Sequence, residues 1–289
     1  MTKTIAEGFR TFHGRLTPTQ GEIDAAMSHR SSIESCLKSN YSITRFFRTG
    51  SFGNGTSIRG YSDVDYFASI PQQYQKTNSS YILRDVRDVL DSRFPYTDVC
   101  VRTPGILLPF GTDGSESNEV IPAYFVKKDN NFQIYKIADG NSGWIGTSPE
   151  AHNHYVKKYD NKLGNKLKPL IRFIKAWKYI RDVPVSSFYL ELSVAKYASN
   201  EKNIQYSFDV RKVLKILWDS QLAAIQDPMG ISGYINPCTT QAKKIDALSK
   251  LNTALIRAQK ARDAENSEKI SDVFYWWNQL YDGRFPSYY

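Results

Sequence analysis

The periodicity of the apolar residues changes near residues 143–148, and this change constrains the fold more than any other feature. Before it, segments of alternating polar and apolar residues lie between helical patterns, which predicts a mixture of strands and helices. After it, nearly every segment has helical spacing, and Ser148 followed by Pro149 is typical of a helix start. We therefore predict an α+β fold, with a mixed-sheet domain and an N-terminal helix over residues 1–145 and a helical bundle over residues 146–289.

Helices are expected in the first half over residues 22–37, where Thr19 and Glu22 have the spacing of a capping box, and around residues 82–90. Strands are expected over residues 41–47, 62–70, 97–102, 106–110, 119–126 and 132–137. In the second half, apolar stripes predict buried helix faces over residues 167–177, 210–217 and 245–255.

Composition narrows the classes of function. The net charge of +9 suits a polyanionic ligand, although a solvated basic surface explains it equally well. Three cysteines, odd in number and far apart, argue against a disulfide framework and against a zinc site. No stretch approaches the roughly 20 apolar residues of a membrane span, and the first residues lack a signal-peptide pattern. We therefore expect a cytoplasmic protein without a membrane partner.

Two aspartates, Asp63 and Asp65, lie on one predicted strand with Val64 between them. Because side chains alternate along a strand, the two carboxylates share a face while Val64 points into the core. Hard divalent cations take oxygen ligands of this kind, and two ions about 3.5–4 Å apart could be bridged by such a pair. An acidic pair on a solvated strand face is the alternative.

A glycine-rich stretch precedes the aspartates and begins with Gly50 and Ser51, directly after a predicted strand. Glycine lets backbone amides approach a ligand closely, so such a turn can hold phosphate oxygens, and the Ser51 hydroxyl could donate to a terminal phosphate. A short helix from Phe52 would add amide dipoles that favour an anion. A flexible hairpin loop is the alternative for this stretch taken alone. The stretch and the acidic pair together are more specific than either.

The order of a Gly-Ser turn, a short spacer and an acidic pair resembles the polymerase-β-like nucleotidyltransferases. The sequence is more closely similar to the cyclic GMP-AMP synthase/DncV-like nucleotidyltransferases of bacterial anti-phage signalling (CD-NTases), and the resemblance extends over residues 43–192. It is carried by further segments in matching order, at residues 119–124, 143–150, 168–178 and 186–191. The resemblance implies a polymerase-β-like catalytic core followed by a helical bundle.

The resemblance also implies a set of metal ligands. In this family three acidic residues hold two Mg²⁺ ions, with Mn²⁺ as an alternative, and the matching positions here are Asp63, Asp65 and Glu119. The family usually has aspartate at the third position, and the glutamate is longer by one methylene but keeps the ligand chemistry. Asp113 and Glu116 are nearby alternatives in a loop rich in glycine and serine.

Nucleotide contacts in the helical half follow from the resemblance as well. Lys175 and Ser187 match residues that contact the triphosphate, and Phe188 matches an aromatic residue that stacks on the base, although it could instead belong to the core. The helical spacing of Lys168, Arg172 and Lys175 predicts a basic stripe turned away from the apolar face, where Lys168 and Arg172 are expected to be solvated.

The predicted function is the Mg²⁺-dependent joining of nucleoside triphosphates (ATP, GTP or others) into a cyclic di- or trinucleotide second messenger for anti-phage defence. The resemblance implies a downstream effector that binds the product. No stable nucleic-acid partner is expected, since the chain carries no appended RNA-binding module. Two alternatives stay open. One is a linear oligonucleotide synthase or RNA-terminal nucleotidyltransferase, and the other is a non-catalytic nucleotide or RNA sensor on the same fold.

Overall fold

The computed structural model describes residues 2–61 and 63–289, with the side chains of Ala26 and Asp113 outside the description. These residues form two compact units. The sheet unit comprises residues 18–154 and 229–233, and the helical unit comprises the chain up to residue 17 together with residues 155–228 and 234–289. The division thus falls after His154, and the first helix belongs to the helical unit, whereas the sequence predicts domains over residues 1–145 and 146–289.

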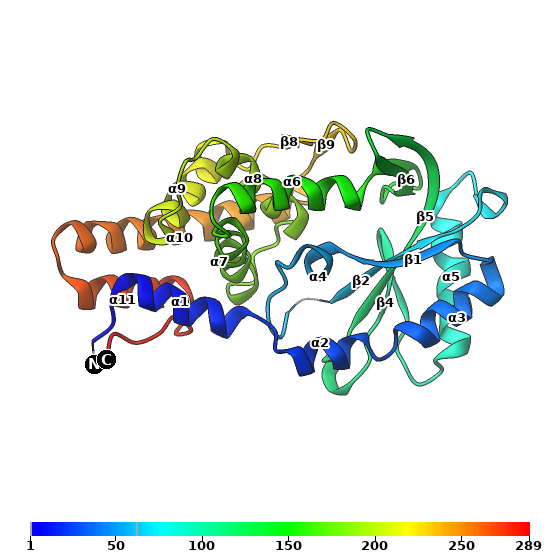
Figure 1. The fold of residues 1–289 in the computed structure, drawn as a ribbon, viewed down its shortest axis with the longest axis horizontal. Coiled ribbons are helices and arrows are strands. Elements are labelled where there is room, and N and C mark those ends of the chain that lie inside the picture. Colours follow the sequence, from blue (N-terminus) through cyan, green and yellow to red (C-terminus); the bar gives the residue numbers. More distant parts are fainter. Residues whose placement is uncertain (1, 62) are drawn as a thin grey trace. The chain divides into compact units, whose positions relative to one another are not determined.

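A seven-stranded mixed sheet runs through the described part of the sheet unit (Figure 1). Neighbours along its main path are β1 (Arg45–Thr49), β2 (Val64–Ser69), β5 (Asn118–Asp129), β4 (Gly105–Leu108) and β3 (Cys100–Arg102). β2 and β5 run parallel, and the other pairs on this path are antiparallel. Beyond an irregularity between Phe125 and Lys127, β5 pairs with β6 (Phe132–Ala138), and β6 pairs with β7 (Trp144–Thr147). The predicted α+β class is confirmed, and β7 is an additional strand.

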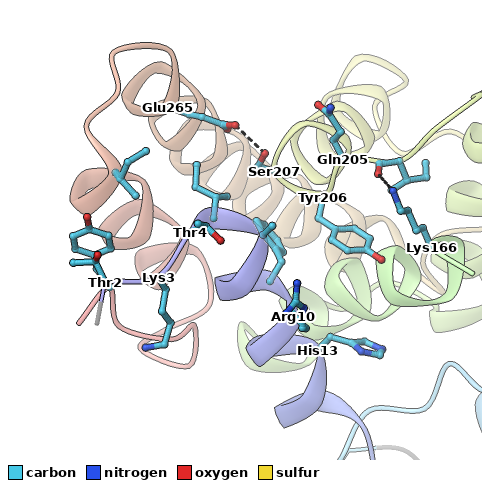
Figure 2. A pocket seen from close by; sticks show the side chains of 16 residues that line it. Thr2, Lys3, Thr4, Arg10, His13, Lys166, Gln205, Tyr206, Ser207 and Glu265 are labelled. Carbon is cyan, nitrogen blue, oxygen red and sulfur yellow. Dashed lines mark hydrogen bonds between the residues drawn. The ribbon is translucent and has the colours of Figure 1, made fainter. Parts of the chain in front are cut away.

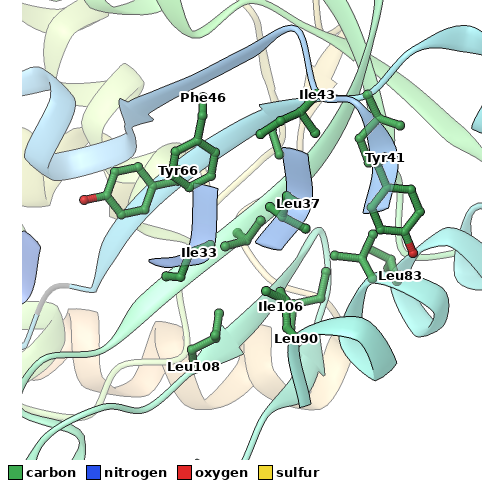
Figure 3. Packing of buried hydrophobic residues seen from close by; sticks show 14 of the residues in the cluster. Ile33, Leu37, Tyr41, Ile43, Phe46, Tyr66, Leu83, Leu90, Ile106 and Leu108 are labelled. Atoms are coloured by element: carbon green, nitrogen blue, oxygen red, sulfur yellow. The ribbon is translucent and has the colours of Figure 1, made fainter. Parts of the chain in front are cut away.

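The core of the sheet unit lies on one face of the sheet. The helices that pack there are α3 (Arg30–Tyr41) and α5 (Ser79–Arg93). Figure 3 shows their side chains meeting those of the strands, among them Ile33, Leu37, Leu83, Leu90, Ile106 and Leu108. Because side chains alternate along a strand, Val64 and Val120 point into this core and are fully buried. Asp65 follows Val64 and Glu119 precedes Val120, so both acids lie on the opposite face.

Short elements connect the strands of this unit: α2 (Gln20–Met27), α4 (Gly50–Asn54), and the 3₁₀ turns at Gln72–Tyr74 and Thr112–Gly114. The capping box of Thr19 and Glu22 is confirmed at the start of α2. The prediction of one continuous helix over residues 22–37 is wrong, because the chain turns before His29. The His29 ring stacks on Phe110 at 3.8 Å between centroids, and its Nε2 lies 2.9 Å from Oε2 of Glu116. These tertiary contacts outweigh local helix propensity.

The helical unit contains α1 (Ile5–Leu16), the later part of α6 (Pro149–Lys162), α7 (Leu167–Ile180), α8 (Ser187–Ser199), α9 (Tyr206–Asp219), α10 (Gln241–Asn266) and α11 (Ile270–Leu280), with a short ribbon of β8 (Ile225–Gln226) and β9 (Tyr234–Ile235). In α1, Phe9 packs edge-on against Phe173 and Trp277, at 5.1 Å between centroids in both cases. The two ends of the chain lie side by side in Figure 1, and the Lys3 amide donates to the Tyr288 carbonyl at 3.1 Å. Among the described residues, no helix has the length and apolar content needed to cross a membrane.

Small residues form much of the buried face of α10, which comprises Ala247, Leu251, Ala254, Ala258, Ala261 and Ala264. Ile245, which the apolar stripe over residues 245–255 places on the buried face, is instead 61% exposed. The prediction is wrong at Ile245, because it weighted the large apolar residues, whereas the side that faces α9 and α11 consists largely of alanines; Leu251 of the same stripe is buried as predicted.

Candidate active site

The parallel pairing of β2 with β5 brings two predicted acidic residues together. Asp65 is the direct register partner of Glu119, although the two are far apart in sequence. Asp63 precedes the first residue of β2. Its Oδ2 and the Oε2 of Glu119 both accept hydrogen bonds from Nη2 of Arg102, at 2.6 and 3.1 Å. The carboxylates of Asp63 and Glu119 therefore converge on one guanidinium, and Asp65 lies beside them on the same face of the sheet.

The glycine-serine turn abuts the same face. β1 ends at Thr49, which pairs with Asp65, and α4 begins at Gly50. Gly50 has a φ of +56°, and a Cβ added there would lie 1.7 Å from Oδ2 of Asp65. Only glycine fits this position, because both its backbone conformation and the closeness of the carboxylate exclude a side chain. Ser51 follows in the first turn of α4, so the turn and the acidic residues form one site.

Burial and charge set the electrostatics of the third acid. Burial raises the pKa of Glu119 to about 6; the guanidinium of Arg102 opposes this rise, and the nearby Asp63 carboxylate adds to it. The sequence analysis also named Glu116 and Asp113 as alternatives to Glu119. Glu116 accepts from His29, and the side chain of Asp113 lies outside the described residues. Glu119 is thus the candidate that shares a cationic partner with Asp63.

The donor set fits hard divalent cations, because carboxylate oxygens are the ligands that such ions prefer. In the parts of the chain that are described, no three acidic, histidine or cysteine side chains stand close enough together to enclose a metal ion as they are. The guanidinium of Arg102 instead occupies the position between Asp63 and Glu119, as a stand-in for a cation. Two carboxylates that already hold a positive group, with Asp65 beside them, are a donor set that fits a divalent cation.

The predicted nucleotide contacts Lys175, Ser187 and Phe188 belong to the helical unit, so their surroundings are described within that unit. Lys175 is 1% exposed, and its Nζ lies 3.4 Å from Oε2 of Glu191 on α8. The prediction that its stripe turns away from the apolar side is wrong at this residue. α7 has α1, α8 and α9 packed around it, and a buried ammonium group needs a charged partner.

Ser187 lies at the start of α8 and meets two side chains of α7. Its Oγ accepts a hydrogen bond from Nζ of Lys178 at 2.7 Å and lies 3.0 Å from the hydroxyl of Tyr179. Phe188 is 39% exposed, so it is not a core residue. Sequence reasoning missed Lys178. The available signal was its spacing of three positions from Lys175, which puts the two lysines on neighbouring parts of the helix surface.

A pocket of about 880 Å³ lies within the helical unit. Figure 2 shows its lining, which includes the basic side chains of Lys3, Arg10 and Lys166 together with Tyr206 and Ser207 of α9. Nζ of Lys166 donates to the backbone carbonyl of Ile204 at 3.3 Å. The acidic residues of the sheet unit do not line this pocket.

A mixed sheet with a glycine-serine turn and carboxylates on adjacent strands defines a nucleotidyltransferase core of the polymerase-β-like class. Residues 3–160 match the family described as the Second Messenger Oligonucleotide or Dinucleotide Synthetase domain, and the chain belongs to this family. The family resemblance inferred from the motifs is thereby confirmed.

Similarity to individual proteins agrees with this assignment. A probable cyclic nucleotide synthase of Bacillus cereus is 24% identical over 173 residues, which cover 59% of this chain and 52% of that protein, so the match spans about half of the relative's length. CdnC of Escherichia coli MS115-1, solved with ATP, superposes with a TM-score of 0.74 at 16% identity and covers 97% of this chain and 98% of its own. The CdnE cyclic dinucleotide synthase of Elizabethkingia meningoseptica has a TM-score of 0.65 at 18% identity, with 86% and 97% covered. At these identities the structural likeness concerns the fold.

Proposed function

We propose that this protein joins nucleoside triphosphates into a cyclic di- or trinucleotide. The observation that carries the proposal is the convergence of Asp63, Asp65 and Glu119 beside the turn at Gly50. Like charges repel at short range, so three acidic side chains on one sheet face destabilise the fold unless a cation offsets their charge. The three acids lie beside Gly50, where the close approach of Asp65 leaves no room for a side chain. This arrangement supports a site for cations and phosphate.

In this proposal Asp63, Asp65 and Glu119 hold divalent cations, two Mg²⁺ ions or Mn²⁺ in their place. Bound there, the metal supplies charge neutralisation at the leaving pyrophosphate and lowers the pKa of the attacking hydroxyl. The protein's own residues do the positioning. The amides at the start of α4 and the hydroxyl of Ser51 bind phosphate oxygens, and the strands keep the carboxylates on one face.

The chemical step is an in-line displacement at the α-phosphorus. A ribose hydroxyl of the acceptor nucleotide forms the new P–O bond, and the bond to the β-phosphate oxygen breaks, with its electron pair leaving on pyrophosphate. The hydroxyl proton passes to a carboxylate of the site or to water. A further displacement within the linear intermediate closes the ring, the second step for a dinucleotide and the third for a trinucleotide, and each step releases one pyrophosphate.

The helical unit contributes the remaining nucleotide contacts in this proposal. Lys175 and Ser187 bind the triphosphate, Lys178 supports Ser187 through the hydrogen bond to its Oγ, and Phe188 offers an exposed ring for base stacking. The structures of CdnC and DncV were solved with ATP, and with ATP and GTP, which supports purine triphosphates as substrates here. A cytoplasmic location follows from the need for these substrates, and an effector that binds the product would transmit the anti-phage signal.

The test incubates the purified full chain with all four α-labelled triphosphates and Mg²⁺, then digests the products with phosphatase. A cyclic product is unchanged by phosphatase because it has no terminal phosphate, whereas a linear product loses its 5′ triphosphate and changes its chromatographic mobility. We expect a resistant product from the wild type and a loss of about 100-fold or more in Asp65→Asn and Glu119→Gln, since each removes a charge that acts in the transition state. Asp91→Asn, an exposed aspartate of α5, is the matched control and keeps wild-type activity.

The outcomes separate the candidate functions. A product whose mobility changes after phosphatase, because it loses terminal phosphates, supports a linear oligonucleotide synthase, and a product that requires added RNA supports terminal transfer. Triphosphate binding that survives in Asp65→Asn, together with no turnover in the wild type at any metal concentration, supports a sensor. Equal activity of Asp65→Asn and Asp91→Asn contradicts the catalytic assignment.

A further inference from the structure

Arg102 ends β3 and contacts acidic residues that come from outside its own hairpin. Its Nη2 is 2.6 Å from Oδ2 of Asp63 and 3.1 Å from Oε2 of Glu119. It also interacts electrostatically with Asp65. The guanidinium therefore touches two of the three proposed metal ligands and lies in the field of the third.

The hairpin of β3 and β4 is shaped around this contact. Arg102 pairs in register with Gly105, the first residue of β4. A Cβ at Gly105 would lie 2.9 Å from Cγ and 3.0 Å from Oε1 of Glu119, and 2.7 Å from the carbonyl oxygen of Val120. Gly105 has no left-handed φ, so the reason for a glycine is space. The side chain of Glu119 thus passes over Gly105, where the hairpin has no side chain, and reaches the guanidinium of Arg102.

We infer that Arg102 is a resident counter-ion of the carboxylates, and that a divalent cation has to displace it before binding there. This inference rests on the proposed function, because it takes Asp63, Asp65 and Glu119 as the metal ligands.

Displacement follows from the positions of the atoms. The oxygens that contact Nη2 are donors that a metal ion would use, and 2.6 Å between Oδ2 of Asp63 and the guanidinium leaves no room for an ion between them. A guanidinium and a dication that share these ligands repel each other strongly at such distances. The Arg102 side chain is 52% exposed, so it can swing into solvent without breaking a packed core.

The contact of Arg102 with the carboxylates has one consequence for the stability of the site before metal binds and another for metal affinity. The positive charge offsets the repulsion among three clustered carboxylates, one of which is buried, and keeps them on one face. The same charge weakens metal affinity, because each binding event includes the loss of the two contacts to Arg102. Arg102 is therefore a positioning residue that sets the metal concentration at which the site fills.

The test measures Mn²⁺ binding to the full chain without nucleotide, from the electron paramagnetic resonance signal of the free ion. We expect Arg102→Gln to bind Mn²⁺ about tenfold more tightly, the scale of one or two charge-assisted hydrogen bonds in a half-exposed setting. Arg102→Lys, which keeps the charge but loses the planar guanidinium whose Nη2 contacts both carboxylates, should lie between Arg102→Gln and the wild type. Arg84→Gln, an exposed arginine of α5 stacked on Tyr81, is the control for loss of net charge and should bind as the wild type.

Asp65→Asn separates failure of the inference from failure of the proposed function. If Asp65→Asn leaves Mn²⁺ affinity unchanged, the ion binds elsewhere and the proposed metal site itself is wrong. If Asp65→Asn weakens binding while Arg102→Gln binds as the wild type or more weakly, the metal site stands and the counter-ion role is overturned. Thermal unfolding of every variant establishes that the compared proteins are folded.

Discussion

Gly50→Ala is the substitution for which the structure gives the clearest expected magnitude. The added Cβ would lie 1.7 Å from Oδ2 of Asp65, whereas real Cβ atoms essentially never approach a neighbour within 3.0 Å. The carboxylate would have to retreat by the difference, 1.3 Å. A displacement of about 1 Å in a catalytic group costs on the order of 100-fold in rate, so we expect a loss of that size.

The substitution also carries a backbone cost that has to be separated from the clash. Gly50 has a φ of +56°, a conformation that costs a residue with a Cβ about 1–2 kcal/mol. Gly164, which follows α6, has a φ of +64° and no atom within 4 Å of an added Cβ. Gly164→Ala therefore carries the same backbone cost without the clash, and it serves as the matched control.

The assay combines the initial rate of pyrophosphate release with the thermal unfolding midpoint. Both variants should lose about 2–4 °C for each kcal/mol of backbone strain. Only Gly50→Ala should lose the activity, while Gly164→Ala stays within about twofold of the wild type. Equal rates for the two variants would refute the argument, because the clash with Asp65 would then have no effect on the reaction.

Three further predictions concern the helical unit. Burial, and then the charge of Arg172, lower the pKa of His13 from 6.5 to about 4, so the unfolded chain binds the extra proton first as the pH falls. About 1–2 kcal/mol of unfolding free energy, discounted for partial exposure, should therefore be lost between pH 6.5 and 4. Urea titrations of His13→Gln should lack that loss. Ser187→Ala should raise the KM for triphosphate about tenfold with a smaller change in kcat, because it removes the acceptor of the Lys178 contact, and a change confined to kcat contradicts this role. Ala258→Leu should destabilise the protein by about 1–3 kcal/mol because the site is fully buried, whereas Ile245→Gln should change stability by less than about 0.5 kcal/mol. Chemical denaturation measures both changes. A larger loss in Ile245→Gln than in Ala258→Leu contradicts the observed buried face of α10.

The sequence predicted local features well where a single segment determines them. The capping box at Thr19, the helix start at Pro149 and the strand that contains Asp65 depend on residues a few positions apart, and all are present. The helix α1 could have been predicted by the same reasoning, since Thr4 and Glu7 form a capping box ahead of an apolar face. The break before His29 could not, because it depends on Phe110, which is distant in sequence.

The candidate site likewise has parts that local sequence patterns predict and parts that depend on non-local pairing. Motif order identified Asp63, Asp65 and Glu119, and the pairing of β2 with β5 is the non-local step that joins them. Arg102 escaped prediction because its contact depends on how a hairpin lies next to β5, which no local pattern encodes. Lys175 was placed on a stripe turned away from the apolar face, yet it is buried, because helical periodicity identifies the faces of a helix without indicating how many of them have neighbours.

The register of β2 against β5 connects the core to the site. Val64 and Val120 are fully buried on the face that α3 and α5 cover, and Asp65 and Glu119, each adjacent to one of these valines in the sequence, lie on the opposite face. A slip of one strand by one residue would turn its acid into the apolar core and its valine out of it. An unpaired carboxylate buried there costs several kcal/mol, and exposing a valine costs about 1.5–3 kcal/mol more. The packing of the helices on the far face of the sheet therefore holds these two carboxylates opposite each other, so core residues that never touch a nucleotide determine where the acids stand.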